Sequence, residues 1–152
     1  MSLTPFAEAR AALLSAAAPV SEIEEVALAA ALGRVLAEPI VSPIAIPAHD
    51  TSAMDGYAVR TTDLHAQGVT LPVSQRIVAG SVGVPLEPGT AARIFTGAPL
   101  PDGADAVVMQ ELTEGHGERV TFMHVPKPGE AVRRAGSEVA LGQTVLAAGA
   151  RL

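Results

Sequence analysis

The 152-residue sequence contains no cysteine and no tryptophan, and only one tyrosine and three phenylalanines. The lack of cysteine excludes disulfide scaffolds, thiolate zinc sites, iron–sulfur clusters and cysteine nucleophiles. A chain of this length buries about two-thirds of its unfolded surface, so it needs no such staple. The length fits one domain or two small ones.

Basic residues are also few, with 10 Lys and Arg against 16 Asp and Glu and a formal charge of −6. An acidic chain with no basic run and few aromatics is a poor binder of nucleic acid or of an anionic membrane surface. No uncharged apolar run is long enough for a transmembrane helix. We therefore predict a cytoplasmic protein with neither nucleic acid nor membrane as a partner. The alternative, a signal peptide over residues 11–20, is disfavoured by the acidic Glu8 before that run.

The first part of the chain is predicted to be helical and then extended. Thr4-Pro5 is a helix-start signal, a hydroxyl cap followed by proline at the first helical position, and Pro19 should end the helix. Residues 22–30 fit either a strand or a short helix. Prolines then confine the chain to an edge strand or an extended linker. These prolines are Pro39, Pro43 and Pro47.

After Pro47 glycine, proline and β-branched residues dominate, which predicts a β domain. Turn signals separate the candidate strands, and a hairpin is expected between 111–112 and 120–121. Short strands at this spacing indicate a small barrel or sandwich. A strand pair turned at Gly142 is predicted within 138–146. The candidate strands of the β domain are 56–60, 71–78, 90–95, 106–112 and 119–125.

The segment PAHDTSAMDGYAVR, residues 47–60, has the highest density of residues that could take part in catalysis or binding. Asp50 and Asp55 flank small residues, and Asp55-Gly56 is a turn pair that presents an acid just before a strand. Asp55 suits a general base or an oxygen ligand for Mg²⁺. The alternative is that both aspartates only cap turns. His49 beside Asp50 is the only suggestive histidine, since the four histidines lack metal-site spacing.

Two further segments carry polar candidates. In RIFTGAPLPDGADAVVMQE, residues 93–111, the amides and hydroxyl of Thr96-Gly97 could hold an oxyanion, with Arg93 and Arg60 adding charge. The alternative is an ordinary β-turn. In PGEAVRRAGSEVALG, residues 128–142, the basic pair Arg133-Arg134 suits an anionic ligand. The alternative here is a surface ion pair with Glu130 or Glu138.

Together and in this order, the stretches SAMDGYAVR, RIFTGAPLPDGADAVVMQE and VRRAGSEV resemble the signatures of the molybdopterin molybdenumtransferase family, which includes bacterial MoeA and the E domain of gephyrin. The resemblance covers nearly the whole chain. It implies a mixed α and β, mainly β fold: an extended linker domain with an N-terminal helix, residues 1–46 and 134–152, and an inserted β domain, residues 47–133. Family members continue into pterin-binding and C-terminal domains, which we expect to be absent here, leaving the linker domain truncated.

The resemblance implies that the full protein inserts molybdenum from molybdate into adenylyl-molybdopterin and releases AMP, assisted by Mg²⁺. It also implies a homodimer, with molybdopterin adenylyltransferase as a further partner. The isolated chain is expected to be inactive. The catalytic residues carried over are Asp55, which is also the Mg²⁺ ligand, and Thr96. The expected substrate- or anion-binding residues are Arg133, Arg134, Gly97 and Ser52, with Asp50 and Glu138 as further polar candidates.

Three positions depart from the family pattern. His49 stands where Phe is common, Ala131 where Asn is frequent, and Ser137-Glu138 where a Glu-Asp pair is usual. The last change weakens the case for Glu138, because its side chain is one methylene longer than that of Asp. Two other functions stay open from the sequence: a non-catalytic dimerisation or scaffold module, and a small-anion-binding module.

Overall fold

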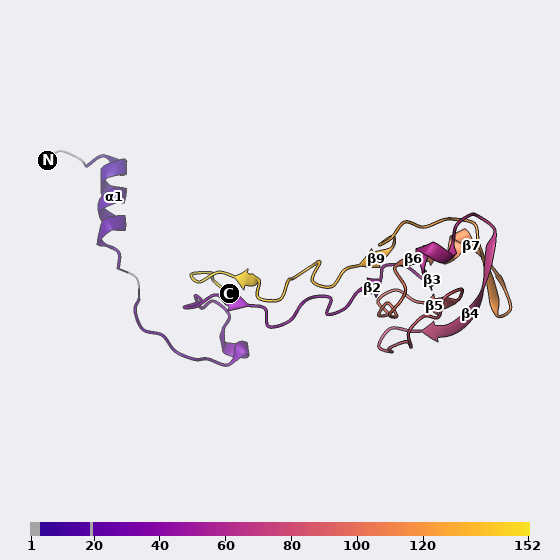
Figure 1. Ribbon diagram of the computed structural model, residues 1–152. Coiled ribbons are helices and arrows are strands. Elements are labelled where there is room, and N and C mark those ends of the chain that lie inside the picture. Colours follow the sequence, from indigo (N-terminus) through magenta and orange to yellow (C-terminus); the bar gives the residue numbers. More distant parts are fainter. Residues whose placement is uncertain (1–3, 19) are drawn as a thin grey trace. The chain divides into compact units, whose positions relative to one another are not determined.

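The computed structural model describes residues 4–18 and 20–152 (Figure 1). The chain divides into two compact units, Met1–Pro39 with Ala147–Leu152, and Ile40–Leu146. The described residues contain one α-helix, and most of the remaining regular structure is β. This confirms the predicted mixed, mainly β fold. The domain limits expected from the sequence, after residues 46 and 133, stay a prediction.

The first unit contains helix α1, Phe6–Ala16, and a single 3-10 turn at Leu28–Ala30. Pro5 occupies the cap position in an extended conformation, and no side chain caps the helix. The predicted Thr4 cap is therefore wrong by one residue. The expected stop at Pro19 lies outside the described residues. Helix α1 buries none of its residues, so its packing does not stabilise it within this chain.

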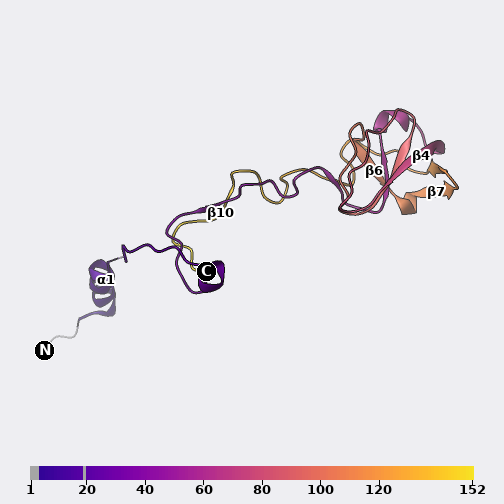
Figure 2. The same ribbon diagram turned by 90° about the horizontal axis from the view of Figure 1, so that it is seen from below.

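The second unit begins with a ribbon made of two antiparallel segments of the chain, which lie side by side in Figures 1 and 2. Strand β1, Ile40–Val41, pairs antiparallel with β10, Thr144–Leu146, and Ile46 bridges Val139. Strand β2, Thr51–Ser52, pairs with β9, Val132–Arg133. The predicted strand pair within 138–146 is therefore wrong. The backbone groups of that segment are taken by residues 40–46 instead.

A six-stranded sheet of order β6-β3-β5-β4-β8-β7 completes the second unit. Strands β4 and β5 are parallel, and the other neighbours are antiparallel. The strands are β3 Gly56–Val59, β4 Val69–Ile77, β5 Ala91–Ile94, β6 Ala106–Met109, β7 Thr113–His116 and β8 Arg119–Phe122.

The predicted strand 106–112 ends early, at Met109, and a 3-10 turn, Gln110–Leu112, follows it. The first arm of the hairpin is therefore β7 rather than residues 111–112. The Gln110 amide still donates to the Asp55 carbonyl (3.0 Å), which continues the β3–β6 register by one residue as the 3-10 turn begins.

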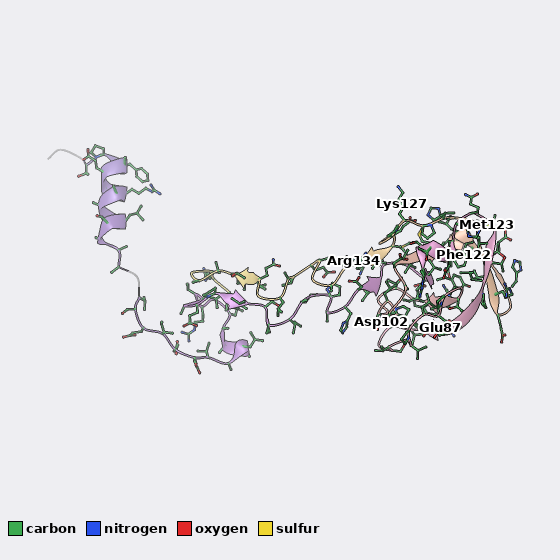
Figure 3. All side chains as sticks on the ribbon, in the orientation of Figure 1. Glu87, Asp102, Phe122, Met123, Lys127 and Arg134 are labelled. Atoms are coloured by element: carbon green, nitrogen blue, oxygen red, sulfur yellow. The ribbon has the colours of Figure 1, made fainter. Side chains whose placement is uncertain are left out.

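The core of the sheet consists of two clusters of buried apolar side chains. One is built around Phe122 and Val59, and the other around Ile94 and Ile77. Figure 3 places Phe122 among the strands of the sheet. In the described ranges, no helix is long and apolar enough to cross a membrane.

Candidate functional site

The three motif segments lie side by side in the second unit, with β2 in the middle. On one side, the Ser52 amide donates to the Ala98 carbonyl (2.9 Å), and the Gly97 amide donates to the Ser52 carbonyl (2.8 Å). On the other side, β2 pairs with β9, and the Ala53 amide donates to the Ala131 carbonyl (2.9 Å). Backbone hydrogen bonds therefore join segments that are far apart in the sequence.

Asp55 and Thr96 form the most specific polar contact of this site. The Asp55 Oδ1 atom accepts hydrogen bonds from the Thr96 amide (2.8 Å) and from the Thr96 hydroxyl (2.7 Å). The two residues meet because Gly56 pairs with Ile94 in the β3–β5 ladder. The Thr96 amide, then its hydroxyl and then the charge of Arg93 hold the pKa of Asp55 below its usual value. Asp55 is therefore an anion at neutral pH.

The expected oxyanion donors at Thr96-Gly97 are engaged within the chain. The Thr96 amide and hydroxyl bind Asp55, and the Gly97 amide binds Ser52. Gly97 has φ +81°, which lets the turn after β5 close without strain. Ser52 is fully buried, and its hydroxyl donates to the Met54 carbonyl (2.5 Å). Thr96 thus anchors a carboxylate, whereas Gly97 and Ser52 hold the backbone in place.

Arg93 and Arg60 lie at opposite ends of β3. Arg93 Nη1 donates to the Gly56 carbonyl (2.8 Å), and its Nη2 donates to the Gln110 side chain (2.7 Å). Arg60 instead donates to the Leu86 carbonyl (3.3 Å), and its Nε is buried without a partner among the described residues. The expectation that Arg60 adds charge beside Thr96 is therefore wrong. Arg93 does lie at the site, as expected.

Asp50 and Arg134 form a second polar contact, and Figure 3 labels Arg134, which directly follows β9 in the chain. The Arg134 guanidinium donates to Asp50 Oδ2 (2.5 Å), and the Ala135 amide donates to Oδ1 (2.8 Å). The Ala135 amide first, and Arg134 second, hold the pKa of Asp50 below its usual value. Arg134 is therefore paired, but with Asp50 and not with Glu130 or Glu138.

Arg133 and Glu138 differ from Arg134 in having no partner. Both are exposed, and their side chains make no hydrogen bond or ion pair with residues that the structure describes. A two-arginine clamp is thus not present, because one of its members is neutralised by Asp50. Arg133 alone stays available to an anion. Glu130 accepts from the Lys127 amide (2.9 Å) and contacts His124 (2.6 Å), so its role is local.

An open hollow of about 510 Å³ lies beside Asp50. It is lined mainly by residues 48–50 and 99–104, with Ala135 and Val82. Asp55 and Thr96 are not among its lining residues, so it does not enclose the pair. Over residues 4–18 and 20–152, no three His, Asp or Glu side chains form a metal-binding cluster. Asp55 thus offers one carboxylate, not a complete metal site.

The Asp50 contact makes a testable contribution to stability. Because the folded-state pKa of Asp50 is lowered, its stabilisation is present above the unfolded value of about 3.9 and is lost as the pH falls through the folded value. The Asp50 and Arg134 side chains are 33% and 58% exposed, so solvent screens the pair. We expect Asp50→Asn to lower the free energy of unfolding by about 0.5 kcal/mol at pH 7.

Urea unfolding at a series of pH values measures this effect. The difference between the variant and the wild type should shrink as the pH falls from about 5 toward 2. Asp102→Asn is the matched control, since the exposed Asp102 side chain makes no hydrogen bond with the described residues. A difference that stays constant over this pH range would show that the charge of Asp50 does not stabilise the fold.

Sequence reasoning did not find Gln110, whose backbone and side chain both contact this site. Its amide holds the Asp55 carbonyl, and its side chain accepts from Arg93. The only available signal was its position at the end of the second motif. That signal predicted a strand over 106–112, whereas strand β6 ends at Met109 and Gln110 begins a 3-10 turn.

Comparison with known proteins is consistent with this geometry. The family described as "MoeA N-terminal region (domain I and II)" matches residues 4–152. A molybdopterin molybdenumtransferase of Haemophilus influenzae is 43% identical over 147 residues, covering 95% of this chain and 36% of the relative. One from a Nostoc species is 46% identical over 136 residues, covering 86% of this chain and 31% of the relative.

Among solved structures, a molybdopterin biosynthesis MoeA protein of Pyrococcus horikoshii matches with a TM-score of 0.91 and 36% identity, covering 99% of this chain and 41% of that one. The fold is thus that of the N-terminal part of a larger class of proteins. The chain belongs to the MoeA N-terminal family, and the resemblance drawn from the three motifs is confirmed. It spans about a third of the length of the curated relatives it matches.

Proposed function

We propose that this chain is the N-terminal part of a molybdenum cofactor biosynthesis enzyme. The whole enzyme inserts molybdenum from molybdate into adenylyl-molybdopterin and releases AMP. Support comes from the family and from the relatives named molybdopterin molybdenumtransferase. The observation that carries the proposal is the Asp55–Thr96 contact, in which a carboxylate of the first motif is held by the amide and hydroxyl of the second. The cytoplasm is the compartment we propose for it.

The chemistry of Asp55 follows from its hydrogen bonds. Thr96 binds Oδ1 twice, whereas Oδ2 accepts no hydrogen bond from the described part of the chain. An ionised carboxylate would repel molybdate and the substrate phosphates unless a cation lies between them. Mg²⁺ is commonly held by one or two carboxylates together with substrate phosphates, so a single free oxygen fits it. When bound, the cation would neutralise the charge of the reacting oxygens.

Three further candidates, Arg133, Asp50 and Arg134, have supporting roles in the proposed site. Arg133 is an exposed cation on β9, paired in register with Thr51 of β2. It is positioned to attract an anionic group, while Asp50 and Arg134 fix the chain that carries it. We further propose that the enzyme is a homodimer, with the pterin-binding part of one chain facing this site on the other. Molybdopterin adenylyltransferase is the proposed supplier of the substrate.

The test is substitution of the pair in the full-length enzyme. Asp55→Asn keeps the shape of the side chain but removes the charge that would bind the cation. We expect kcat to fall by about 100-fold or more. Thr96→Ala removes one of the two bonds to Oδ1 and should cost less. Activity is measured as AMP released from adenylyl-molybdopterin with molybdate and Mg²⁺.

Asp102→Asn is the control in this assay, because it also removes one exposed carboxylate from the same unit. It should leave the activity unchanged. An Asp55→Asn enzyme with normal, metal-dependent turnover would show that Asp55 has no catalytic role.

One observation favours the alternative of a dimerisation or scaffold module. Helix α1 buries none of its residues, and Phe6, Leu13 and Leu14 are mostly exposed. Exposed apolar side chains on one helix are typical of an interaction surface. Equilibrium dialysis of the chain against molybdate separates this alternative from a small-anion binder, since a scaffold would bind none.

A further inference from the structure

Arg93 is held on several sides beside the Asp55–Thr96 pair. Its two terminal nitrogens donate to the Gly56 carbonyl (2.8 Å) and to the Gln110 Oε1 atom (2.7 Å). The guanidinium also lies 4.5 Å from the centre of the Phe95 ring and 5.2 Å from that of Tyr57. Two hydrogen bonds and two aromatic rings together fix the plane of this guanidinium.

Arg93 donates hydrogen bonds to Gly56 and Gln110, two residues that neighbour or contact Asp55. Gly56 is the next residue in the chain, so the carbonyl bonded to Arg93 is one peptide away from the Asp55 side chain. The Gln110 amide donates to the Asp55 carbonyl (3.0 Å), and the side chain of the same glutamine accepts from Arg93. Gln110 therefore holds the carbonyl of the Asp55–Gly56 peptide, and Arg93 holds the carbonyl of the peptide that follows it.

The stacking of Arg93 on Phe95 places it next to Thr96, the second residue of the Asp55–Thr96 pair. Phe95 immediately precedes Thr96, and its ring lies against the Arg93 guanidinium. Arg93 therefore contacts the chain next to both Asp55 and Thr96. Its positive charge also lies close enough to favour the ionised form of the Asp55 carboxyl.

We propose that Arg93 is a positioning residue that holds the Asp55 carboxylate in the orientation needed for the cation and the substrate. This inference rests on the proposed function, because it assumes that Asp55 acts in the reaction. Arg93 does not need to touch the substrate, since its nitrogens are already bonded to Gly56 and Gln110. Lysine would not replace it, because an ammonium group lacks the planar fork and stacks poorly.

Arg76 provides a matched control within the same unit. Its guanidinium also lies over the Phe95 ring, 4.9 Å from the centre, but among the described residues it donates no hydrogen bond to the Asp55 or Gly56 backbone. Arg93→Met and Arg76→Met thus both remove a positive charge and a guanidinium that lies over the Phe95 ring, and Arg93→Met also removes the contact with Tyr57. Only Arg93→Met removes the hydrogen bonds that lead to Asp55.

The experiment compares these variants in the full-length enzyme. For Arg93→Met we expect kcat to fall by about 10- to 100-fold, and the Mg²⁺ concentration for half-maximal activity to rise by a similar factor. The KM for adenylyl-molybdopterin should change less than kcat, and Arg93→Lys should not restore activity. Arg76→Met should stay within about twofold of the wild type in all three quantities. Activities are normalised to the folded fraction measured by circular dichroism.

Gln110→Ala keeps the charge of Arg93 and removes one acceptor, so it tests the same role if Arg93→Met folds poorly. It should raise the Mg²⁺ requirement by several-fold. An inactive Asp55→Asn enzyme together with an Arg93→Met enzyme that matches Arg76→Met would overturn this inference alone. An active Asp55→Asn enzyme would instead overturn the proposed function, and the inference with it.

Discussion

Replacement of Phe122 by alanine is expected to lower the free energy of unfolding by about 3–5 kcal/mol. Phe122 ends β8 and is fully buried in the first core cluster. Its ring also meets that of Tyr57 edge to face, with centroids 6.1 Å apart and an interplanar angle of 84°. Alanine would lose the buried ring and leave a cavity that the neighbouring strands only partly close. Urea unfolding followed by circular dichroism measures the loss.

Phe6→Ala is the matched control for this substitution. Phe6 lies on α1 with 83% of its surface exposed, so the same change removes almost no buried area. Its effect should stay within about 0.5 kcal/mol. If the two variants lost equal stability, the packing of Phe122 would not be what stabilises the sheet.

The Phe122 substitution also bears on the site, through one chain of contacts. The Tyr57 ring that packs on Phe122 lies 5.2 Å from the Arg93 guanidinium. Without the Phe122 ring, Tyr57 loses its packing partner, and the contact between Tyr57 and the Arg93 guanidinium is less well ordered. The core and the candidate site share side chains, so a stable core is a condition for an ordered Asp55.

Much of the local structure was predictable from the sequence, because it depends on neighbouring residues. The Thr4-Pro5 start signal predicted α1, and β-branched residues with turn signals predicted β3, β5 and β8. Strand β7 was not predicted, since Thr113–His116 has no apolar residue and is mostly exposed. It becomes a strand only by pairing with β8, which is a contact that the local pattern does not contain.

Strand pairing was the part that sequence patterns did not predict. Residues 138–146 have the composition of a hairpin, but their partners are Ile40, Val41 and Ile46 at the other end of the unit. The parallel pairing of β4 and β5 is likewise invisible in either strand alone. Propensity describes one segment at a time, whereas a ladder depends on which other segment can bury its face.

The same limit applies to the candidate site. The motifs identified Asp55 and Thr96 separately, but the hydrogen bond between them spans 41 positions. Arg134 was expected to bind an anionic ligand, with an ion pair to Glu130 or Glu138 as the alternative, and it pairs with Asp50, 84 positions away. Reasoning from spacing favours partners close in the sequence. The β3–β5 pairing brings Asp55 and Thr96 together, and the β2–β9 pairing does so for Asp50 and Arg134. No motif predicted the β2–β9 pairing.

Substitution of Gly56 by alanine is the second change with a large expected effect. A Cβ atom at this position would lie 2.1 Å from the Val108 carbonyl oxygen, far inside van der Waals contact. That oxygen belongs to the backbone of β6, which pairs with β3 at this point, so neither strand can shift without breaking the ladder. We expect Gly56→Ala to lower the free energy of unfolding by about 3 kcal/mol or more.

Gly115→Ala is the matched control, because a Cβ there would meet only the Tyr57 hydroxyl at 3.9 Å, an ordinary contact. Its effect should stay within about 0.5 kcal/mol in the same urea titration. Gly56 also carries the carbonyl that binds Arg93, so a displaced β3 would misplace Asp55 as well. The fraction of Gly56→Ala enzyme that still folds should therefore have low turnover. A stable, fully active Gly56→Ala enzyme would show that β3 and β6 can separate without disturbing Asp55.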